Sequence, residues 1–189
     1  MANHVDRFLF HPFNGNQQMS QSGVITFKGN PMTLAGSALQ VGQAAPDFKL
    51  HFAHEGIQTL TLEDLKGKPS IVSVVPSLDT PTCAVQTKTF NQKLGEMGDK
   101  INAVTVSRDL PFAQARFCGA EDVKMQVASD YQTHDFGEDY GIEIEELKLL
   151  SRGVFVLDAD GKVVYKEVVS EVTQEPNYDA ALAALSGLV

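Results

Sequence analysis

The sequence is short of cysteine, of basic residues and of long apolar runs. Only two of its 189 residues are cysteine, Cys83 and Cys118. It is therefore not a disulfide-dense secreted domain, and a reducing compartment, the cytoplasm, is the expected location. Its 15 lysines and arginines face 24 acids, and the net charge of −9 disfavours nucleic acid and anionic membranes as partners. No apolar run approaches the roughly 20 residues of a bilayer-spanning helix, so no membrane protein is expected.

The residues that are present suit one folded domain. Hydrophobic residues make up 43% of the chain, enough for a packed core, and the length predicts a single domain. Residues 1–18 carry no signal-peptide pattern, and Met19 opens a more ordinary start. We therefore interpret residues 1–18 as an N-terminal extension, outside a domain that covers residues 19–189.

The acids are concentrated in one segment. Residues 119–146 hold nine acids and a single lysine, which is nearly the whole excess of negative charge. A run of this kind most often forms a solvated face, and that is our interpretation. A docking surface for another protein, or a metal site, is the alternative.

Hydrophobic patterns predict an α/β domain with a mixed sheet flanked by helices. Two nearly continuous runs of β-branched residues, 70–75 and 101–106, are typical of buried central strands. The other predicted elements are an N-terminal hairpin over 23–34, strands over 48–52, 57–61 and 123–127, a helical turn over 62–67, helices over 82–94, 112–117 and 178–185, and a hairpin over 154–166. Strands that alternate with helices and end in a late hairpin indicate the mixed sheet.

The segment from Pro76 to Cys83 holds the candidate chemistry. Thr80 is expected to cap a helix whose first residue is Pro81, because proline pre-sets the helical backbone angle. Cys83 then lies in the first turn, at the carboxyl end of a central strand, where open α/β sheets place their ligand sites. Free N–H groups and the helix dipole favour a thiolate there, although the dipole contributes only about 0.3–1 kcal/mol. Strong activation therefore requires a second cation, and an inert buried cysteine is the alternative.

These residues also carry a resemblance to a known family. Pro76, Thr80 and Cys83 form Pro-x-x-x-Thr-x-x-Cys, which resembles the peroxidatic motif of the peroxiredoxins. From about residue 22 to its end, the chain is similar to their bacterial thiol peroxidase branch, the atypical enzymes with two reactive cysteines. Three further segments carry this likeness: 109–121 with Cys118, 149–158 with Arg152, and 171–182. The departures from the branch's pattern lie outside the motif residues: Ser151, Gly153, the acidic loop 143–146 and the extension 1–18.

The resemblance implies a thioredoxin-like fold and a peroxidase of antioxidant defence. The Cys83 thiolate would attack hydrogen peroxide or an organic hydroperoxide, releasing water or an alcohol and becoming a sulfenic acid. Arg152 would supply the second cation, the Thr80 hydroxyl would bond to the sulfur, and Pro76 would screen it from water. Cys118 would resolve the sulfenic acid as an intramolecular disulfide after local unwinding of both cysteine segments, and thioredoxin would reduce that disulfide. A homodimer is implied, and neither a metal nor an organic cofactor is.

Three other functions compete with this one. A redox sensor of thioredoxin fold would form the disulfide as a signal, and peroxide consumption with thioredoxin, thioredoxin reductase and NADPH distinguishes it from an enzyme. A metal-binding module is a poor match, because the cysteines are 35 positions apart and the five histidines are scattered. A non-catalytic interaction protein would be preferred if Pro76, Thr80 or Arg152 were missing, and all three are present.

Overall fold

A computed structural model describes residues 20–189, so the extension predicted over residues 1–18 lies outside the described residues. The strands are β1 Ser20–Phe27, β2 Asn30–Ala35, β3 Lys49–Ala53, β4 Ile57–Thr61, β5 Ser70–Val74, β6 Asn102–Ser107, β7 Gln126–Ser129, β8 Glu143–Ile144, β9 Leu149–Leu150, β10 Gly153–Leu157 and β11 Val163–Val168. The helices are α1 Pro81–Leu94, α2 Pro111–Glu121, α3 Asp135–Asp139 and α4 Tyr178–Ser186, with 3-10 turns at Glu63–Leu65 and Gly95–Lys100.

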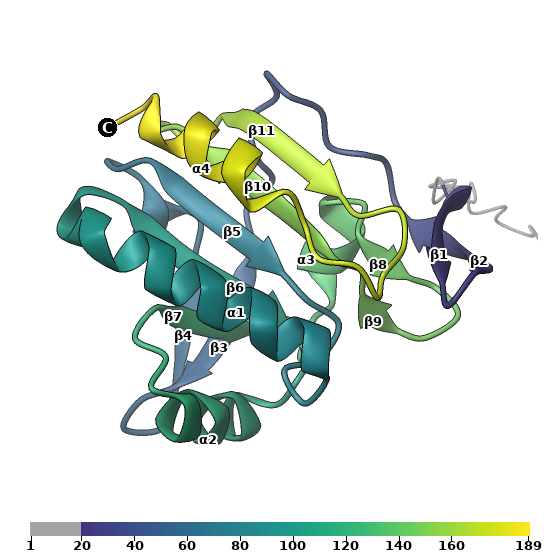
Figure 1. Cartoon of the computed structure of the whole chain (residues 1–189), viewed down its shortest axis with the longest axis horizontal. Coiled ribbons are helices and arrows are strands. Elements are labelled where there is room, and N and C mark those ends of the chain that lie inside the picture. The colour runs from purple at the N-terminus through teal and green to yellow at the C-terminus, as the bar shows by residue number, and fades with distance from the viewer. Residues whose placement is uncertain (1–19) are drawn as a thin grey trace, which may run out of the picture.

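A seven-stranded mixed sheet forms the centre of the molecule, in the order β11-β10-β5-β6-β7-β3-β4 (Figure 1). β5, β6 and β7 run parallel, and their neighbours on both sides run antiparallel to them. A smaller sheet has the order β1-β2-β8-β9, so the predicted N-terminal hairpin pairs with a second hairpin, whose first strand, β8, belongs to the acidic segment. The predicted mixed α/β architecture is confirmed.

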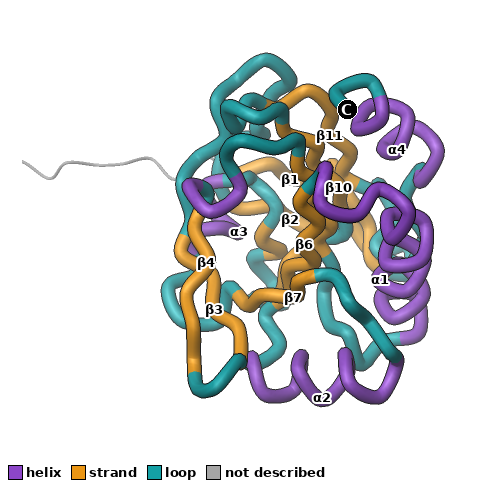
Figure 2. Tube along the Cα trace, turned by 90° about the vertical axis from the view of Figure 1, so that its left-hand side faces the viewer, coloured by secondary structure: helices purple, strands orange, loops and turns teal. Residues whose placement is uncertain are grey.

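Side chains of the central strand β5 alternate between two hydrophobic layers. Ile71 packs with Phe90 in a cluster shared with α1 and α4, whereas Val72 packs with Phe136 in the cluster on the opposite face. Figure 2 accordingly shows α1 and α4 on one side of the sheet and α3 on the other. Because β5 is covered on both faces, all five of its residues are buried, as its β-branched composition predicts.

The parallel strands bring both cysteine-bearing helices to one edge of the sheet. α1 follows β5 and α2 follows β6, so both helices begin at the carboxyl ends of neighbouring parallel strands. Asp109, just before α2, accepts hydrogen bonds of 2.7 Å from the Ser77 hydroxyl and from the backbone N–H of Leu78, just before α1. This carboxylate fixes the two helix starts relative to each other.

The acidic segment differs from its interpretation as a solvated face. It contains α3 and β8, and Asp130 and Glu143 within it are buried. Both carboxylates pair with the buried guanidinium of Arg108, at 3.2 and 2.5 Å. The solvated-face interpretation is wrong for these two residues, because an arginine from outside the segment neutralises them inside the fold.

Between residues 20 and 189, no cluster of three or more histidine, cysteine or acidic side chains is arranged to hold a metal ion. Over the same range, no helix has the length and apolar character needed to cross a membrane.

Candidate active site

Cys83 lies in the first turn of α1, with its side chain completely buried. The helix begins as predicted, with Thr80 in the capping position and Pro81 as its first residue. The Thr80 hydroxyl does not accept from a helix N–H group; it donates to the Ser77 carbonyl oxygen at 2.9 Å. Pro76, also buried, lies between the end of β5 and this first turn of α1.

Arg152 is placed against Cys83 by the pairing of β10 with β5. Gly153, the first residue of β10, lies opposite Val74, the last residue of β5, so the residue before β10 reaches the start of α1. The Arg152 Nη2 atom lies 3.2 Å from the Cys83 sulfur. The structure therefore brings together the predicted thiol and the predicted second cation, 69 positions apart in the chain.

Three hydrogen bonds hold the Arg152 guanidinium in a single orientation. Besides the sulfur, it donates from Nε to the Val172 carbonyl oxygen at 2.8 Å and from Nη1 to Gln86 Oε1 at 2.7 Å. Gln86 is fixed in turn by its own bond to the Ser73 hydroxyl at 2.8 Å. Within the described part of the chain no carboxylate forms an ion pair with Arg152. Its charge is therefore directed at the sulfur, in a site where Arg152 is only 2% exposed.

The two departures from the family pattern that flank Arg152 are tightly packed. Ser151 is buried, and its hydroxyl has no hydrogen-bond partner among the described residues. At Gly153 a Cβ atom would stand 2.7 Å from the Glu167 carbonyl oxygen and 2.7 Å from a methyl carbon of Ile142. A larger residue there would require the backbone of β11 to shift.

A cavity of about 270 Å³ opens above this site. Pro76, Thr80 and Arg152 line it together with apolar side chains that the sequence did not single out, among them Phe27, Leu149 and Val172. These come from β1, from β9 and from the segment after β11. Cys83 itself is not among the lining residues and lies beneath them. The result is a mostly apolar pocket that the Arg152 guanidinium lines, with the Cys83 thiol buried behind it and bonded to it.

Cys118 is a half-buried thiol in the second half of α2. It packs against the same apolar cluster as Cys83, which includes Val75, Leu78 and Val127. Burial raises the pKa of the Cys118 thiol. Both cysteines are free, and Cys118 borders a separate cavity of about 520 Å³ that shares no lining residue with the pocket at Arg152. The two predicted cysteines thus share one apolar cluster, in which Cys83 is fully buried while Cys118 borders a cavity.

The chain is similar to known proteins over most of its length. The redoxin family model matches residues 40–182. The thiol peroxidase of Bacillus subtilis is 49% identical over 166 residues, which is 87% of this chain and 98% of that protein. The thiol peroxidase of Staphylococcus aureus is 47% identical over 87% of this chain and 98% of its own length.

A solved structure confirms the fold. The crystal structure of a peroxiredoxin-like protein from Aquifex aeolicus superimposes with a TM-score of 0.81 at 38% identity, covering 88% of this chain and 98% of that one. This match and the two curated relatives extend over nearly the whole described chain and include the residues gathered around Cys83. The chain therefore belongs to the redoxin family, as a member of its thiol peroxidase group.

Proposed function

We propose that this chain works as a peroxidase in which Cys83 attacks the substrate, Arg152 activates it and Cys118 resolves the product. As a thiol peroxidase the chain reduces hydroperoxides with electrons taken from thiols. The single observation that carries the residue assignment is the 3.2 Å contact between the Arg152 guanidinium, which lines an apolar pocket, and the Cys83 sulfur behind it.

In the first step the Cys83 thiolate attacks one peroxide oxygen. A sulfur–oxygen bond forms and the oxygen–oxygen bond breaks, so sulfur is oxidised to a sulfenic acid while the leaving oxygen takes a proton and departs as water or an alcohol. Arg152 stabilises the thiolate and the negative charge that develops on the leaving oxygen. Thr80, exposed at the pocket, offers its hydroxyl oxygen as an acceptor to the substrate, since its proton is donated to Ser77, and the buried ring of Pro76 keeps water from the sulfur.

The pocket favours organic hydroperoxides over hydrogen peroxide. Phe27, Leu149 and Val172 offer apolar surface to a substrate that carries a hydrocarbon group. Burying such a group is favourable by about 25 cal/mol for each Å². Hydrogen peroxide has no carbon and gains nothing from these walls.

Resolution requires a local change of structure. A disulfide needs Cα atoms within about 7 Å, and both cysteines are held inside helices. Only Pro111 and Gln114 of α2 are buried, and Gln114 binds the sheet through hydrogen bonds to the Ser107 hydroxyl and the Ala128 carbonyl. Because α2 has so little apolar anchoring, its unwinding brings Cys118 to the sulfenic acid, which releases water as the disulfide forms.

Thioredoxin is the proposed reductant, since a dithiol can reduce the internal disulfide by exchange and leave both cysteines free again. Such a cycle belongs in a reducing compartment, and we place the chain in the cytoplasm. The proposed assembly is a homodimer. Leu110 and Phe112, which stand 54% and 65% exposed at the start of α2, support it as apolar contacts for a second copy.

The test is peroxide consumption in the presence of thioredoxin, thioredoxin reductase and NADPH. The wild-type protein should oxidise NADPH continuously when a hydroperoxide is added, whereas Cys83→Ser should abolish this turnover. Cys83→Ser activity above about a tenth of wild type would contradict the assignment of Cys83, because Cys118, the other cysteine of the chain, has a raised pKa that keeps it protonated. A single oxidation without turnover would instead identify a redox sensor.

A further inference from the structure

The carboxylate of Glu171 accepts five hydrogen bonds. Oε1 accepts from the backbone N–H of Lys28 at 3.0 Å and from the N–H and hydroxyl of Thr173 at 3.0 and 2.6 Å. Oε2 accepts from the Thr26 hydroxyl at 2.8 Å and from the N–H of Gly29 at 3.0 Å. These donors, first the Thr173 hydroxyl, hold the pKa of the Glu171 carboxyl well below its ordinary range. The side chain is therefore an anion at every pH at which the protein functions.

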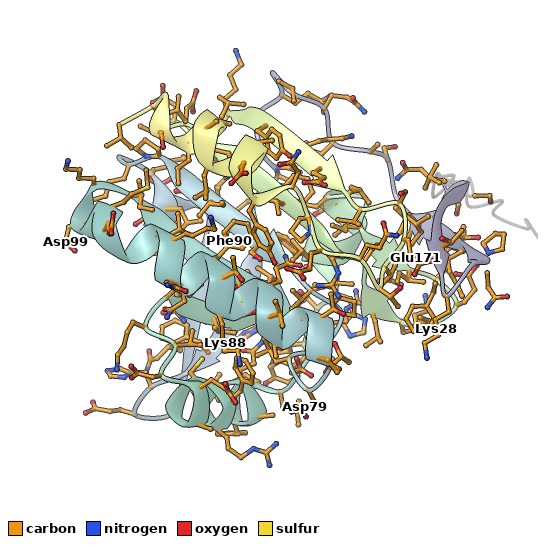
Figure 3. All side chains as sticks on the ribbon, viewed as in Figure 1. Lys28, Asp79, Lys88, Phe90, Asp99 and Glu171 are labelled. Carbon is orange, nitrogen blue, oxygen red and sulfur yellow. The ribbon has the colours of Figure 1, made fainter. Side chains whose placement is uncertain are left out.

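Glu171 joins two segments that are distant in the sequence. Lys28 and Gly29 form the β1–β2 turn, and both have left-handed backbone angles, with φ of 51° and 79°. That conformation directs two successive N–H groups toward one anion. Figure 3 labels Lys28 and Glu171 at the same end of the molecule, beside the β1–β2 hairpin. The carboxylate thus fastens the tip of the hairpin to the segment after β11.

The same segment holds the active site through its next two carbonyl oxygens. The Val172 oxygen accepts from Arg152 Nε at 2.8 Å, and the Thr173 oxygen accepts from the Thr82 hydroxyl in the first turn of α1 at 3.3 Å. Glu171 itself is not among the residues that line the pocket, but Phe27, Lys28, Val172 and Thr173 all line it. Glu171 therefore connects one wall of the pocket to the side that carries the guanidinium.

We propose that Glu171 is a positioning residue that holds the Phe27–Lys28 wall of the pocket and so sets the preference for organic hydroperoxides. This inference rests on the proposed function and deepens it. A hydrocarbon group has to contact the wall, so its reaction depends on where the hairpin tip lies. Hydrogen peroxide needs only the thiol and Arg152, and the bonds of Arg152 to Gln86 and Cys83 involve no residue of the hairpin.

Glutamine is the informative replacement because it keeps the size of the side chain. One carboxylate oxygen becomes an NH₂ group, which cannot accept a hydrogen bond. Since each oxygen of Glu171 serves at least two donors, Glu171→Gln leaves two or three donors without their acceptor.

The experiment measures the rate constants for oxidation of the reduced protein by cumene hydroperoxide and by hydrogen peroxide, in stopped flow. In Glu171→Gln the ratio of the cumene rate constant to the hydrogen peroxide rate constant should fall about tenfold. Thr26→Val removes one of these donors and keeps the backbone bond between Thr26 and Val172, and Thr26 itself does not line the pocket. This variant should lower the ratio in the same direction by less. If Glu171→Gln folds poorly, Thr26→Val still tests the positioning role.

The matched control is Glu167→Gln. Glu167 accepts the N–H of Asn177 at 3.1 and 3.0 Å, in the same part of the chain, and neither residue lines the pocket. Glu167→Gln should leave the ratio of the two rate constants at the wild-type value, even if it changes the melting temperature. A ratio that stays unchanged in both Glu171→Gln and Thr26→Val overturns the positioning role, and so does an equal fall in both rate constants. A wild-type protein that reacts with neither peroxide contradicts the proposed function instead.

Discussion

Replacing Arg152 by glutamine removes the cation closest to the reactive sulfur. The guanidinium lies 3.2 Å from Cys83 and also binds Gln86 and the Val172 carbonyl, so one substitution removes a charge and a fixed array of donors. Glutamine is shorter and neutral, and cannot reach all three acceptors. The prediction is that the Cys83 sulfur attacks peroxide more slowly, because the charge beside it is lost.

The size of the effect follows from distance and burial. At 3.2 Å, two unit charges attract by about 5 kcal/mol at an effective dielectric constant of about 20, which is an upper limit for the loss. Water screens this attraction little, because Cys83 is 0% and Arg152 2% exposed. Removing one fixed donor from a developing charge typically slows a reaction about 10²- to 10³-fold. We expect Arg152→Gln to lower the rate constant with peroxide by about that factor.

The assay is stopped-flow oxidation of the reduced protein by hydrogen peroxide, with circular dichroism to show that the variant is folded. Arg152→Lys is the matched control: it keeps the charge but cannot bind three acceptors at once, so its rate should lie between those of wild type and Arg152→Gln. An Arg152→Gln rate within about threefold of wild type would refute the role given to Arg152, because it would leave less than about 1 kcal/mol for this contact.

The remaining predictions concern Cys118. In Cys118→Ser the first oxidation should keep its wild-type rate. The sulfenic acid on Cys83 should then persist, react with dimedone and, in excess peroxide, be oxidised to sulfinic acid. Turnover of this variant with thioredoxin at the wild-type rate would show that the internal disulfide is not part of the cycle. In the wild type, burial raises the pKa of Cys118, so its neutral thiol predominates at pH 7 and the reactive thiolate increases with pH. Disulfide formation, followed by rapid acid quenching and mass spectrometry, should therefore accelerate steadily from about pH 7 to 8.5. A constant rate over that range would show that ionisation of Cys118 does not limit the step.

The parts of the fold that could be predicted from the sequence are those with a strong local signal. The β-branched run of β5 and the Thr80-Pro81 start of α1 each determine their structure within a few residues. The α2 helix extends to Glu121, beyond the predicted end at residue 117, so Cys118 lies inside it. The helix continues through Gly119 and Ala120, where the sequence has no periodic pattern of apolar residues that would predict it.

Features that depend on distant segments were not predictable in this way. The β8–β9 hairpin consists of two strands of two residues each, too short for an alternating pattern to register. Burial of Asp130 depends on Arg108, 22 positions away, and an acid in a run of acids gives no sign of such a partner. The pocket wall likewise joins Phe27 to Leu149, and Glu171 acts on a turn that precedes it by more than 140 positions. The distant contact of Arg152 with Cys83 was predicted, because the segment 149–158 resembles a segment of the family that carries an arginine.

The most direct test of the account is the mass of the reduced protein before and after one equivalent of hydroperoxide. Conversion of the two free thiols, Cys83 and Cys118, into one internal disulfide removes two hydrogen atoms. The proposed cycle therefore predicts a loss of about two daltons from a chain that is not covalently linked to another, and a single cross-linked peptide that contains both cysteines. A stable gain of one oxygen atom, or a disulfide between two chains, would contradict it.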